Sequence, residues 1–393
     1  FFEPPIHLRH LSDSDHTETM LRLVEMIRKN KYNEQPTTLF CENAGTVYRF
    51  LAALLAITPG NWILSGNERM MQRPVGPLVD ALRKLGAQID YQGEDGYPPI
   101  KITGTAMHGG EVRVDGSISS QFISALILIG PVLKGGLTID IRNKIASMPY
   151  IQMTLKMLAH FDIESRFKNN VISIPEVPYS ATGLDIEPDW SSASFWYELA
   201  ALSQKADLFL SGLVQQSWQG DAVLSDIFNT LGVKTFFDND GIRVNKKNNR
   251  ADKFIFNFSN NPDLALPVIT TCAGLNMQGV FSGLENLRFK ESDRISALMT
   301  ELSKFGFSLD LNQQNDIILH QLEKEKTENK PHDAQLLRVK TYGDHRMAMA
   351  FAPLGILFGG IAIENPMVVT KSYPRFWHEM KKIDVFQLRN LTS

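Results

Sequence analysis

A repeated pattern of one amphipathic helix followed by two short strands is the feature that most constrains the fold of this chain. The pattern occurs four times, and its helices end at positions 86, 161, 232 and 306, which are 75, 71 and 74 residues apart. Further copies of the helix are expected at 20–30 and 375–383. Repeats of this length that contain both helices and strands are typical of supersecondary units packed around shared cores. The sequence therefore predicts an α/β protein built from repeated units.

A second, more apolar helix is expected before each amphipathic one. The stretches 122–129, 195–202, 264–272 and 347–358 are apolar on nearly every side, which indicates burial. Their polar residues concentrate in the first turn, where capping explains serine and aspartate. Capping does not explain Arg346, because an unpaired cation entering a buried helix would be costly. We therefore expect Arg346 to contact an anion, and the N–H groups at several such helix starts would suit phosphate.

Composition excludes several classes of function. The 40 basic and 43 acidic residues leave a formal net charge of −3, so no overall positive field is available for nucleic acid or an anionic membrane. Any anion site must therefore be local. The two cysteines, Cys41 and Cys272, exclude a disulfide framework and a thiolate metal cage, and they favour a reducing cytoplasm. No apolar run approaches the roughly 18 residues of a membrane span, and 393 residues suffice for about two or three domains.

The stretch 286–294, Asn-Leu-Arg-Phe-Lys-Glu-Ser-Asp-Arg, leads into one of the amphipathic helices. We expect Glu291 to Arg294 to form the first turn of that helix. A helix N-terminus is electropositive and prefers anions, so the cations Lys290 and Arg294 at this position indicate an anionic visitor. The alternative is a surface ion cluster in which both cations pair with Glu291 and Asp293.

Ten short motifs follow one another along the chain. They are Asn43-Ala-Gly-Thr46, Glu68-Arg-Met-Met-Gln-Arg-Pro74, Asp115-Gly-Ser-Ile-Ser-Ser-Gln-Phe122, Ser147-Met-Pro-Tyr150, Asp189-Trp-Ser-Ser-Ala-Ser194, Gln219-Gly-Asp221, Pro262-Asp-Leu-Ala265, Leu287-Arg-Phe-Lys-Glu-Ser-Asp-Arg294, Asp344-His-Arg-Met-Ala-Met349 and Lys371-Ser-Tyr-Pro374. In this order they closely resemble the 5-enolpyruvylshikimate-3-phosphate (EPSP) synthase family, the carboxyvinyl transferases of the shikimate pathway. Any one motif is weak, but ten in the family's order over nearly the whole chain are specific.

The resemblance implies a two-domain inverted α/β barrel, the enolpyruvyl transferase fold, in which each domain holds three βαβαββ repeats with buried parallel helices. It places an N-terminal domain, on the shikimate-3-phosphate side, at 1–186 and a C-terminal domain at 187–393, with a hinge near 185–188. In the family, a preceding N-terminal strand completes the C-terminal domain. The family's N-terminal Lys-Ser-x-Ser-Asn-Arg segment, which contributes a lysine and an arginine to the active site, is absent from this sequence.

The resemblance also implies the activity of a 3-phosphoshikimate 1-carboxyvinyltransferase. The enolpyruvyl group of phosphoenolpyruvate would pass to the 5-hydroxyl of shikimate 3-phosphate with release of phosphate, by addition–elimination through a tetrahedral intermediate. This chemistry needs a base at the hydroxyl and an acid at the methylene carbon, for which we expect Asp263 and Glu291. Domain closure should exclude water and raise the pKa of Glu291, whereas the neighbouring cations Lys290 and Arg294 would lower it. The family implies no metal or organic cofactor, and a cytoplasmic monomer whose partners are its two small-molecule substrates.

The residues expected to bind the substrates follow from the same resemblance. The shikimate-3-phosphate site would use Ser119, Ser120, Gln121, Ser147, Tyr150, Asp263, Asn286 and Lys290. The phosphoenolpyruvate site would use Gly45, Arg73, Gln121, Arg294, Arg346 and Lys371. Planar guanidinium groups suit the carboxylate and phosphate of phosphoenolpyruvate, and a glycine allows close approach of a ligand to the backbone.

Two alternatives and three departures from the family pattern accompany this hypothesis. The UDP-N-acetylglucosamine enolpyruvyl transferases share the fold but typically use a loop cysteine as the acid, and neither cysteine of this chain matches it. A non-catalytic relative would bind shikimate 3-phosphate without turnover, because the N-terminal lysine segment is absent. Val47 and Tyr48 are also bulkier than the family's usual residues, and Gly343 replaces a common asparagine.

Overall fold

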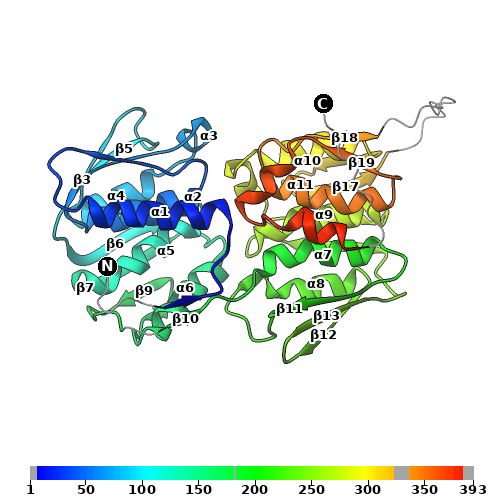
Figure 1. The fold of residues 1–393 in the computed structure, drawn as a ribbon, viewed down its shortest axis with the longest axis horizontal. Helices are drawn as coiled ribbons and strands as arrows, with labels where there is room; N and C mark the ends of the chain where they lie inside the picture. Colours follow the sequence, from blue (N-terminus) through cyan, green and yellow to red (C-terminus); the bar gives the residue numbers. More distant parts are fainter. Residues whose placement is uncertain (1–6, 181–182, 323–335, 384–393) are drawn as a thin grey trace. The chain divides into compact units, whose positions relative to one another are not determined.

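The computed structural model describes residues 7–180, 183–322 and 336–383. The chain divides into two compact units, Phe1–Ile186 (unit 1) and Glu187–Ser393 (unit 2). Figure 1 shows that each unit combines helices with small sheets.

Unit 1 contains two four-stranded sheets with the same topology. The first has the order β2 (Thr37–Phe40), β3 (Gly60–Ser65), β5 (Ile100–Gly104), β4 (Gln88–Tyr91), with helices α2 (Gly45–Ala56), α3 (Glu68–Met71) and α4 (Gly76–Lys84) between its strands. The second has the order β6 (His108–Asp115), β7 (Lys134–Arg142), β9 (Val171–Ile174), β8 (Arg166–Lys168), with α5 (Ser120–Ile129) and α6 (Met148–His160). In each, the first two strands are parallel and the last two form an antiparallel hairpin. Both are therefore βαβαββ units.

The remaining elements of unit 1 lie at its two sequence ends. Strand β1 (Leu8–Arg9) pairs in parallel with β10 (Leu184–Asp185), and helix α1 (Asp15–Lys29) follows β1. The side chain of Ser14 caps α1 by accepting a hydrogen bond from the backbone N–H of Thr17. This helix confirms the copy of the repeat expected at 20–30.

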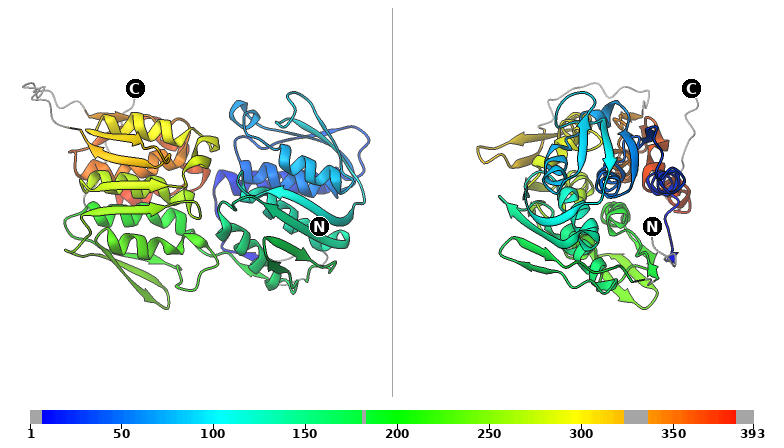
Figure 2. Two further views of the ribbon diagram at one scale, coloured as in Figure 1. Left: turned by 180° about the vertical axis from the view of Figure 1, so that it is seen from behind. Right: turned by 90° about the vertical axis from the view of Figure 1, so that its left-hand side faces the viewer.

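Unit 2 contains a third sheet of the same topology and two smaller ones. The four-stranded sheet has the order β14 (Lys253–Asn257), β15 (Gln278–Ser282), β17 (Ile317–Gln321), β16 (Phe307–Leu311), with α9 (Ala265–Gly274) and α10 (Arg294–Ser303). The others are β11 (Asp207–Ser211), β13 (Gly241–Lys246), β12 (Val233–Asp238) and the parallel pair β18 (Leu337–Val339), β19 (Ile361–Ile363). Their helices are α7 (Trp190–Leu202), α8 (Leu224–Thr230), α11 (His345–Phe351) and α12 (Phe376–Lys381). In the left view of Figure 2 the strands of unit 2 lie in front of its helices.

The burial predicted for the apolar helices is confirmed at 195–202 and 264–272. It was wrong for the end of the stretch 347–358, because helix α11 ends at Phe351 and the side chains of Leu357 and Phe358 are exposed. Every residue of α7 except Ser192, and every residue of α9 except Gly274, is buried. Both helices belong to one continuous hydrophobic core in unit 2, which also takes in α11 and the inner faces of the sheets. Within the parts of the chain that the structure describes, no helix is both long enough and apolar enough to cross a membrane.

The predicted start of the helix after residue 290 was wrong. Helix α10 begins at Arg294, and residues 291–293 precede it without helical structure. The reason is that Asp293 is the N-cap: its Oδ1 accepts a hydrogen bond from the backbone N–H of Ser296 at 3.1 Å. Aspartate is among the preferred N-cap residues, so the helix starts one residue after it. Glu291 consequently lies in the loop before the helix, and the loop backbone sets the direction of its side chain.

Candidate active site

Three buried helices of unit 2 bring polar groups together at their N-termini. Asp189 caps α7 by accepting hydrogen bonds from the N–H groups of Ser191 and Ser192 at 3.0 and 3.2 Å. Asp344 caps α11 by accepting one from the N–H of Arg346 at 3.0 Å. Helix α9 follows directly on a 3-10 turn, η3 (Pro262–Leu264), which carries Asp263. Because the helices themselves are apolar and buried, their charged residues gather at this end.

Arg294 is the centre of this group, with a side chain that is only 1% exposed. Its Nε donates to Asp344 Oδ2 at 2.8 Å, and its Nη2 donates to Glu291 Oε2 at 2.8 Å. Its Nη1 donates to Asp263 Oδ1 at 3.1 Å. Arg294 therefore holds three carboxylates that come from three separate loops. Charge-assisted bonds of this kind in a buried place are strong and directional.

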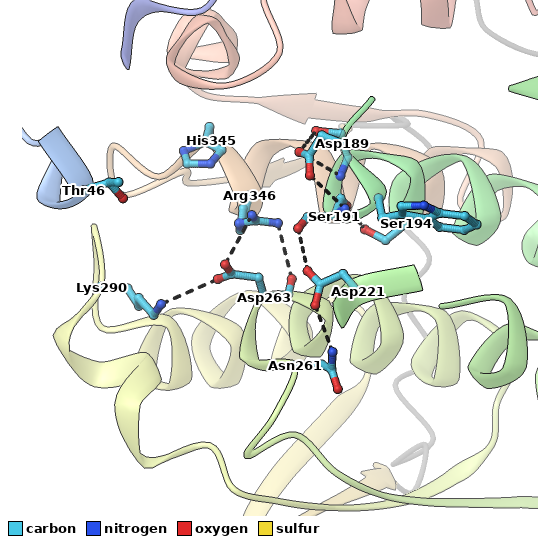
Figure 3. A network of polar contacts seen from close by, with 12 residues as sticks. Thr46, Asp189, Ser191, Ser194, Asp221, Asn261, Asp263, Lys290, His345 and Arg346 are labelled. Carbon is cyan, nitrogen blue, oxygen red and sulfur yellow. Dashed lines mark hydrogen bonds and ion pairs between the residues drawn. The ribbon is translucent and has the colours of Figure 1, made fainter. Parts of the chain in front are cut away.

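Asp263 also lies beside two further cations, as Figure 3 shows. Lys290 Nζ is 3.7 Å from its Oδ1, and Arg346 Nη2 is 3.5 Å from its Oδ2. Burial alone would raise the pKa of the Asp263 carboxyl, but Arg346, Lys290 and Arg294 together hold this pKa well below its usual range. Arg346 does meet an anion, as the sequence predicted, and that anion is Asp263.

Asp344 is the fully buried member of the group. Its Oδ2 accepts a hydrogen bond from Ser292 Oγ at 3.1 Å as well as the bond from Arg294. Burial would raise its pKa, but the Arg294 guanidinium lowers it, so Asp344 stays ionised. Burial lowers the pKa of the neighbouring His345 to about 4, which leaves that imidazole neutral near pH 7. The acid–base residues expected from the sequence are Asp263 and Glu291, and not His345.

A second buried carboxylate, Asp221, lies close to Asp263 (Figure 3). Ser191 Oγ donates to its Oδ2 at 2.5 Å, and Asn261 Nδ2 donates to its Oδ1 at 3.0 Å. Burial, and then the negative charge of Asp263, raise the pKa of Asp221. Asp221 was part of a motif in the sequence, but no role was predicted for it.

The remaining predicted residues of unit 2 flank this cluster. Lys371 Nζ donates to the backbone carbonyl of Gly343 at 2.7 Å, next to Asp344 in the chain. Gly343 has φ +67°, a left-handed conformation that both glycine and asparagine tolerate, so its departure from the family pattern fits the backbone. Asn286 is half-buried in the 3-10 helix η4 (Glu285–Phe289), shortly before Lys290.

In unit 1 the predicted residues gather at the start of helix α2. Gly45 is the first residue of α2, and a Cβ there would lie 2.5 Å from Arg73 Nη2 and 2.6 Å from Arg49 Nη1. Arg73 Nη1 donates to the carbonyl of Asn43 at 3.0 Å. Arg49 Nη1 donates to Gln121 Oε1 at 2.5 Å. Two buried guanidinium groups therefore lie against one glycine, and a side chain at position 45 would displace them.

Gln121 joins helices α2 and α5, because its Nε2 donates to Thr46 Oγ1 at 2.8 Å. Ser119 is the N-cap of α5 and accepts from the N–H of Gln121 at 3.3 Å, and Ser120 is the buried first residue of that helix. The other predicted pair lies at the start of α6. Ser147 is its N-cap residue, with φ +58° and a buried side chain, and Tyr150 lies in its first turn.

The departures at Val47 and Tyr48 fit the core of unit 1. Both side chains are buried, and the Tyr48 hydroxyl donates to the carbonyl of Leu64 at 3.1 Å. The hydrogen-bonded hydroxyl satisfies the polar end of a large core residue. Within the described ranges 7–180, 183–322 and 336–383, no group of three or more His, Cys, Asp or Glu residues is arranged to hold a metal ion.

The structure separates the predicted site residues into two sets. Unit 1 holds Gly45, Arg73, Ser119, Ser120, Gln121, Ser147 and Tyr150, and unit 2 holds Asp263, Asn286, Lys290, Glu291, Arg294, Arg346 and Lys371. The alternative of an ion cluster was correct for the Arg294–Glu291 pair, but the cluster is buried, and Asp293 pairs with Arg288 at 3.3 Å instead. Arg49 was missed. By the argument used for Arg346, that an arginine in an otherwise apolar helix needs a partner, Arg49 would also have been identified.

Comparison with known proteins identifies the family of this chain. The family model described as EPSP synthase (3-phosphoshikimate 1-carboxyvinyltransferase) matches residues 7–380. A relative from Bacteroides fragilis, named 3-phosphoshikimate 1-carboxyvinyltransferase, is 42% identical over 374 residues, which cover 95% of this chain and 88% of the relative. A relative of the same name from Sulfurovum sp. is 34% identical over 358 residues, covering 90% and 81%.

The fold agrees as well. The solved structure of EPSP synthase from Acinetobacter baumannii aligns with a TM-score of 0.66 over 88% of this chain and 78% of that one, at 24% sequence identity. That likeness shows the two-domain enolpyruvyl transferase fold. The relatives' names favour the shikimate branch over the UDP-N-acetylglucosamine enolpyruvyl transferases. With a family model matched from residue 7 to residue 380 and two relatives above 30% identity over most of its length, this chain belongs to the EPSP synthase family.

Proposed function

We propose that this chain transfers the enolpyruvyl group of phosphoenolpyruvate to the 5-hydroxyl of shikimate 3-phosphate and releases phosphate, the reaction of its family. The observation that carries the proposal is the cluster around Arg294. It places the two carboxylates expected to act as base and acid, Asp263 and Glu291, on one guanidinium, with Lys290 and Arg346 beside them. Both substrates are anions, and these cations can donate charge-assisted hydrogen bonds to their carboxylate and phosphate oxygens.

Asp263 is the proposed base at the 5-hydroxyl. With three cations close by, its carboxylate is a weak base as it stands, because its pKa is held low. An anionic substrate that binds Lys290 or Arg346 would share those charges and weaken their hold on Asp263. We infer that substrate binding itself makes Asp263 a better proton acceptor, which is the direction that catalysis needs.

Glu291 is the proposed acid at the methylene carbon. Its ion pair with Arg294 at 2.8 Å favours the charged form, so protonation must accompany a weakening of that contact. A phosphate or carboxylate of the substrate that approaches Arg294 would compete for the same Nη2 group. The acid role of Glu291 and the proposed contact of Arg294 with phosphoenolpyruvate are therefore linked.

The proposed phosphoenolpyruvate residues differ in how accessible their charge is. Arg294 already donates to three carboxylates, so direct contact with substrate would displace one of them. Lys371 donates to a neutral backbone carbonyl, which a charged substrate oxygen replaces more easily. We infer that Lys371 makes the first contact in unit 2. In unit 1, Gly45, Arg73 and Gln121 complete the proposed set.

The proposed shikimate-3-phosphate residues are polar groups at helix starts together with one cation. They are Ser119, Ser120, Gln121, Ser147, Tyr150, Asp263, Asn286 and Lys290. Hydroxyl and amide groups of this kind suit a polyhydroxylated ring and its phosphate, and Lys290 supplies a positive charge.

The first experiment is phosphate release from phosphoenolpyruvate, measured with and without shikimate 3-phosphate. We expect release only when both substrates are present. Glu291→Gln should lower kcat by about 10²–10⁴-fold, the usual contribution of a general acid or base. Glu285→Gln, an exposed glutamate in the same segment, should leave kcat unchanged.

Two outcomes separate the alternatives. Release without shikimate 3-phosphate would contradict the proposed reaction. Binding of shikimate 3-phosphate with no release would instead support the non-catalytic relative. The monomeric state and the cytoplasmic location expected from the sequence remain predictions, and light scattering of the purified chain tests the first.

A further inference from the structure

The loop 340–344, between strand β18 and helix α11, has an unusual backbone. Two consecutive residues, Tyr342 and Gly343, have φ values of +53° and +67°. Glycine adopts this left-handed conformation readily, but a tyrosine does so reluctantly. The loop ends at Asp344, and its Gly343 carbonyl accepts the hydrogen bond from Lys371 at 2.7 Å. The loop is therefore strained, yet it positions Asp344 and the carbonyl that binds Lys371. Contacts from elsewhere in unit 2 must hold it in this conformation.

Glu301 on helix α10 contacts this loop from inside the core of unit 2. Its side chain has 0% exposure. Its Oε1 accepts a hydrogen bond from the Tyr342 hydroxyl at 2.8 Å, and its Oε2 accepts one from the backbone N–H of Lys340 at 3.1 Å. Lys304 Nζ lies 2.5 Å from the same Oε2 and neutralises the buried charge. Both oxygens of Glu301 are thus used, and two of the three donors belong to the loop.

Helix α10 therefore holds the loop at two points. Arg294 and Glu301 are seven residues apart, which is about two helical turns, so both side chains leave the same face of α10. Arg294 holds Asp344 at the end of the loop, and Glu301 holds residues 340 and 342 near its start. One rigid helix thereby sets the position of the whole segment that leads into Arg346.

We propose that Glu301 is a positioning residue for phosphoenolpyruvate binding, acting through the loop 340–344 on Lys371 and Arg346. This inference rests on the proposed function. Glu301 acts on those two residues indirectly. It binds the Tyr342 hydroxyl and the Lys340 N–H, which belong to the loop whose Gly343 carbonyl accepts from Lys371 and whose end leads into Arg346. Burial, and then the hydrogen bond to Glu301 and its charge, raise the pKa of Tyr342 to about 12, so the tyrosine keeps the proton that it donates.

The alternative is that Glu301 only stabilises the fold, which a buried, charge-paired glutamate does in any case. The two roles differ in what they do to the substrates separately. A purely structural role weakens the binding of both substrates together, or of neither. The positioning role weakens phosphoenolpyruvate more, because Lys371 and Arg346 belong to that proposed site, whereas Lys290 and Asn286 lie on a different segment.

The test compares Glu301→Met, which removes both acceptors, with Glu301→Gln. A glutamine whose amide group donates to the Tyr342 hydroxyl and whose carbonyl accepts from the Lys340 N–H can keep both loop contacts. We expect Glu301→Met to raise the KM for phosphoenolpyruvate by about tenfold or more, as small misplacements of binding groups do. The Kd for shikimate 3-phosphate should stay within about threefold. Glu301→Gln should recover most of the KM change.

Two further variants complete the design. Tyr342→Phe removes one of the two loop contacts and should give an intermediate KM for phosphoenolpyruvate. Glu198→Met is the matched control, because Glu198 also has 0% exposure and lies on a buried helix of unit 2, beside Thr270. It should leave both substrate constants unchanged, whatever it does to Tm.

The inference fails if folded Glu301→Met binds phosphoenolpyruvate like the parent chain, or if both substrates weaken equally. It also fails if Glu301→Gln and Glu301→Met raise KM alike, since that would remove the link to the loop contacts. A parent chain that releases no phosphate at all would instead overturn the proposed function. In that case, direct binding of phosphoenolpyruvate to the parent chain and to Glu301→Met still decides on Glu301.

Discussion

The two units hold their buried arginines by different means. In unit 1, Arg49 and Arg73 donate to an amide oxygen and to a backbone carbonyl, and both lie against Gly45. In unit 2, Arg294 donates to three carboxylates, and Arg346 lies beside one of the three. Close packing thus defines the first group, and charge compensation defines the second. A change of side-chain volume should therefore disturb the arginines of unit 1 most, and a change of charge should disturb those of unit 2 most.

This difference also bears on how each group would meet an anionic substrate. The unit 2 cluster contains its own carboxylates, so a substrate anion must compete with them, and binding redistributes charge on Asp263 and Glu291. The unit 1 group offers guanidinium groups in a fixed place. We infer that unit 2 couples binding to proton transfer, whereas unit 1 contributes mainly position.

The largest effect is expected from removing the central charge of unit 2. Arg294→Met would leave three carboxylates together without their shared cation. Breaking a buried ion pair by removing one partner costs about 3–5 kcal/mol in the free energy of unfolding. Denaturant unfolding measures the loss. The double variant Arg294→Met/Asp344→Asn removes one of the stranded charges and should recover part of it. A loss below about 1 kcal/mol would equal that of a surface ion pair and contradict the charge-compensated cluster.

The corresponding change in unit 1 adds volume without adding charge. In Gly45→Ala, the new methyl group would lie 2.5 Å from Arg73 Nη2 and 2.6 Å from Arg49 Nη1, so both guanidinium groups must move. We expect the KM for phosphoenolpyruvate to rise about tenfold, with a small change in Tm because the ends of arginine side chains are flexible. Gly93→Ala is the control, since its methyl group would meet no atom closer than 3.8 Å. Equal KM values for the two variants would show that unit 1 is not defined by packing.

A third prediction concerns a carboxyl in unit 2 that lies apart from the cluster. Burial raises the pKa of Glu198 well above its ordinary value, and the Thr270 hydroxyl lowers it only in part. A folded-state pKa above the unfolded one stabilises the protein at pH values below the unfolded pKa, near 4.3. That stability is lost as the pH rises from there through the folded pKa, at up to about 1.4 kcal/mol per pH unit.

Glu198→Gln removes this dependence on pH. Its free energy of unfolding should therefore gain on that of the parent chain as the pH rises above about 4.3. Denaturant unfolding at several pH values between 4 and 8 measures the difference. A difference that stays constant over this range would show that Glu198 is ionised in the fold, which would contradict the raised pKa.

Much of the architecture could be predicted from the sequence, because periodicity reports which face of an element is buried. The apolar helices, the hairpins and the repeat length follow from such patterns, and the order of the motifs identified the family. Arg346 was expected to meet an anion for a physical reason, and it does. The sequence also indicated the residue types of the cluster, because charged residues at the starts of apolar helices stand out in it.

The partners within the cluster could not be predicted. Asp263, Glu291 and Asp344 come from three loops, and only the packing of α9, α10 and α11 brings them to one guanidinium. The start of α10 was predicted wrongly, because a local hydrogen bond from Ser296 to Asp293 decides it rather than the apolar period. Nothing in the sequence distinguished Glu301 from the other polar residues of its amphipathic helix, because its contacts with residues 340 and 342 arise only in the folded chain.

The smallest effect is expected at Asp293, which adjoins Arg294 but lies outside the buried cluster. It caps α10 and pairs with the exposed Arg288 at 3.3 Å. Asp293→Ala removes the cap and should cost about 1 kcal/mol in the free energy of unfolding. Asp293→Asn keeps the cap and removes the charge, so it should cost only a few tenths of that, about 0.3 kcal/mol. If Asp293→Asn costs as much as Asp293→Ala, then charge matters even at the exposed edge of unit 2, and charge compensation there extends beyond the three carboxylates on Arg294.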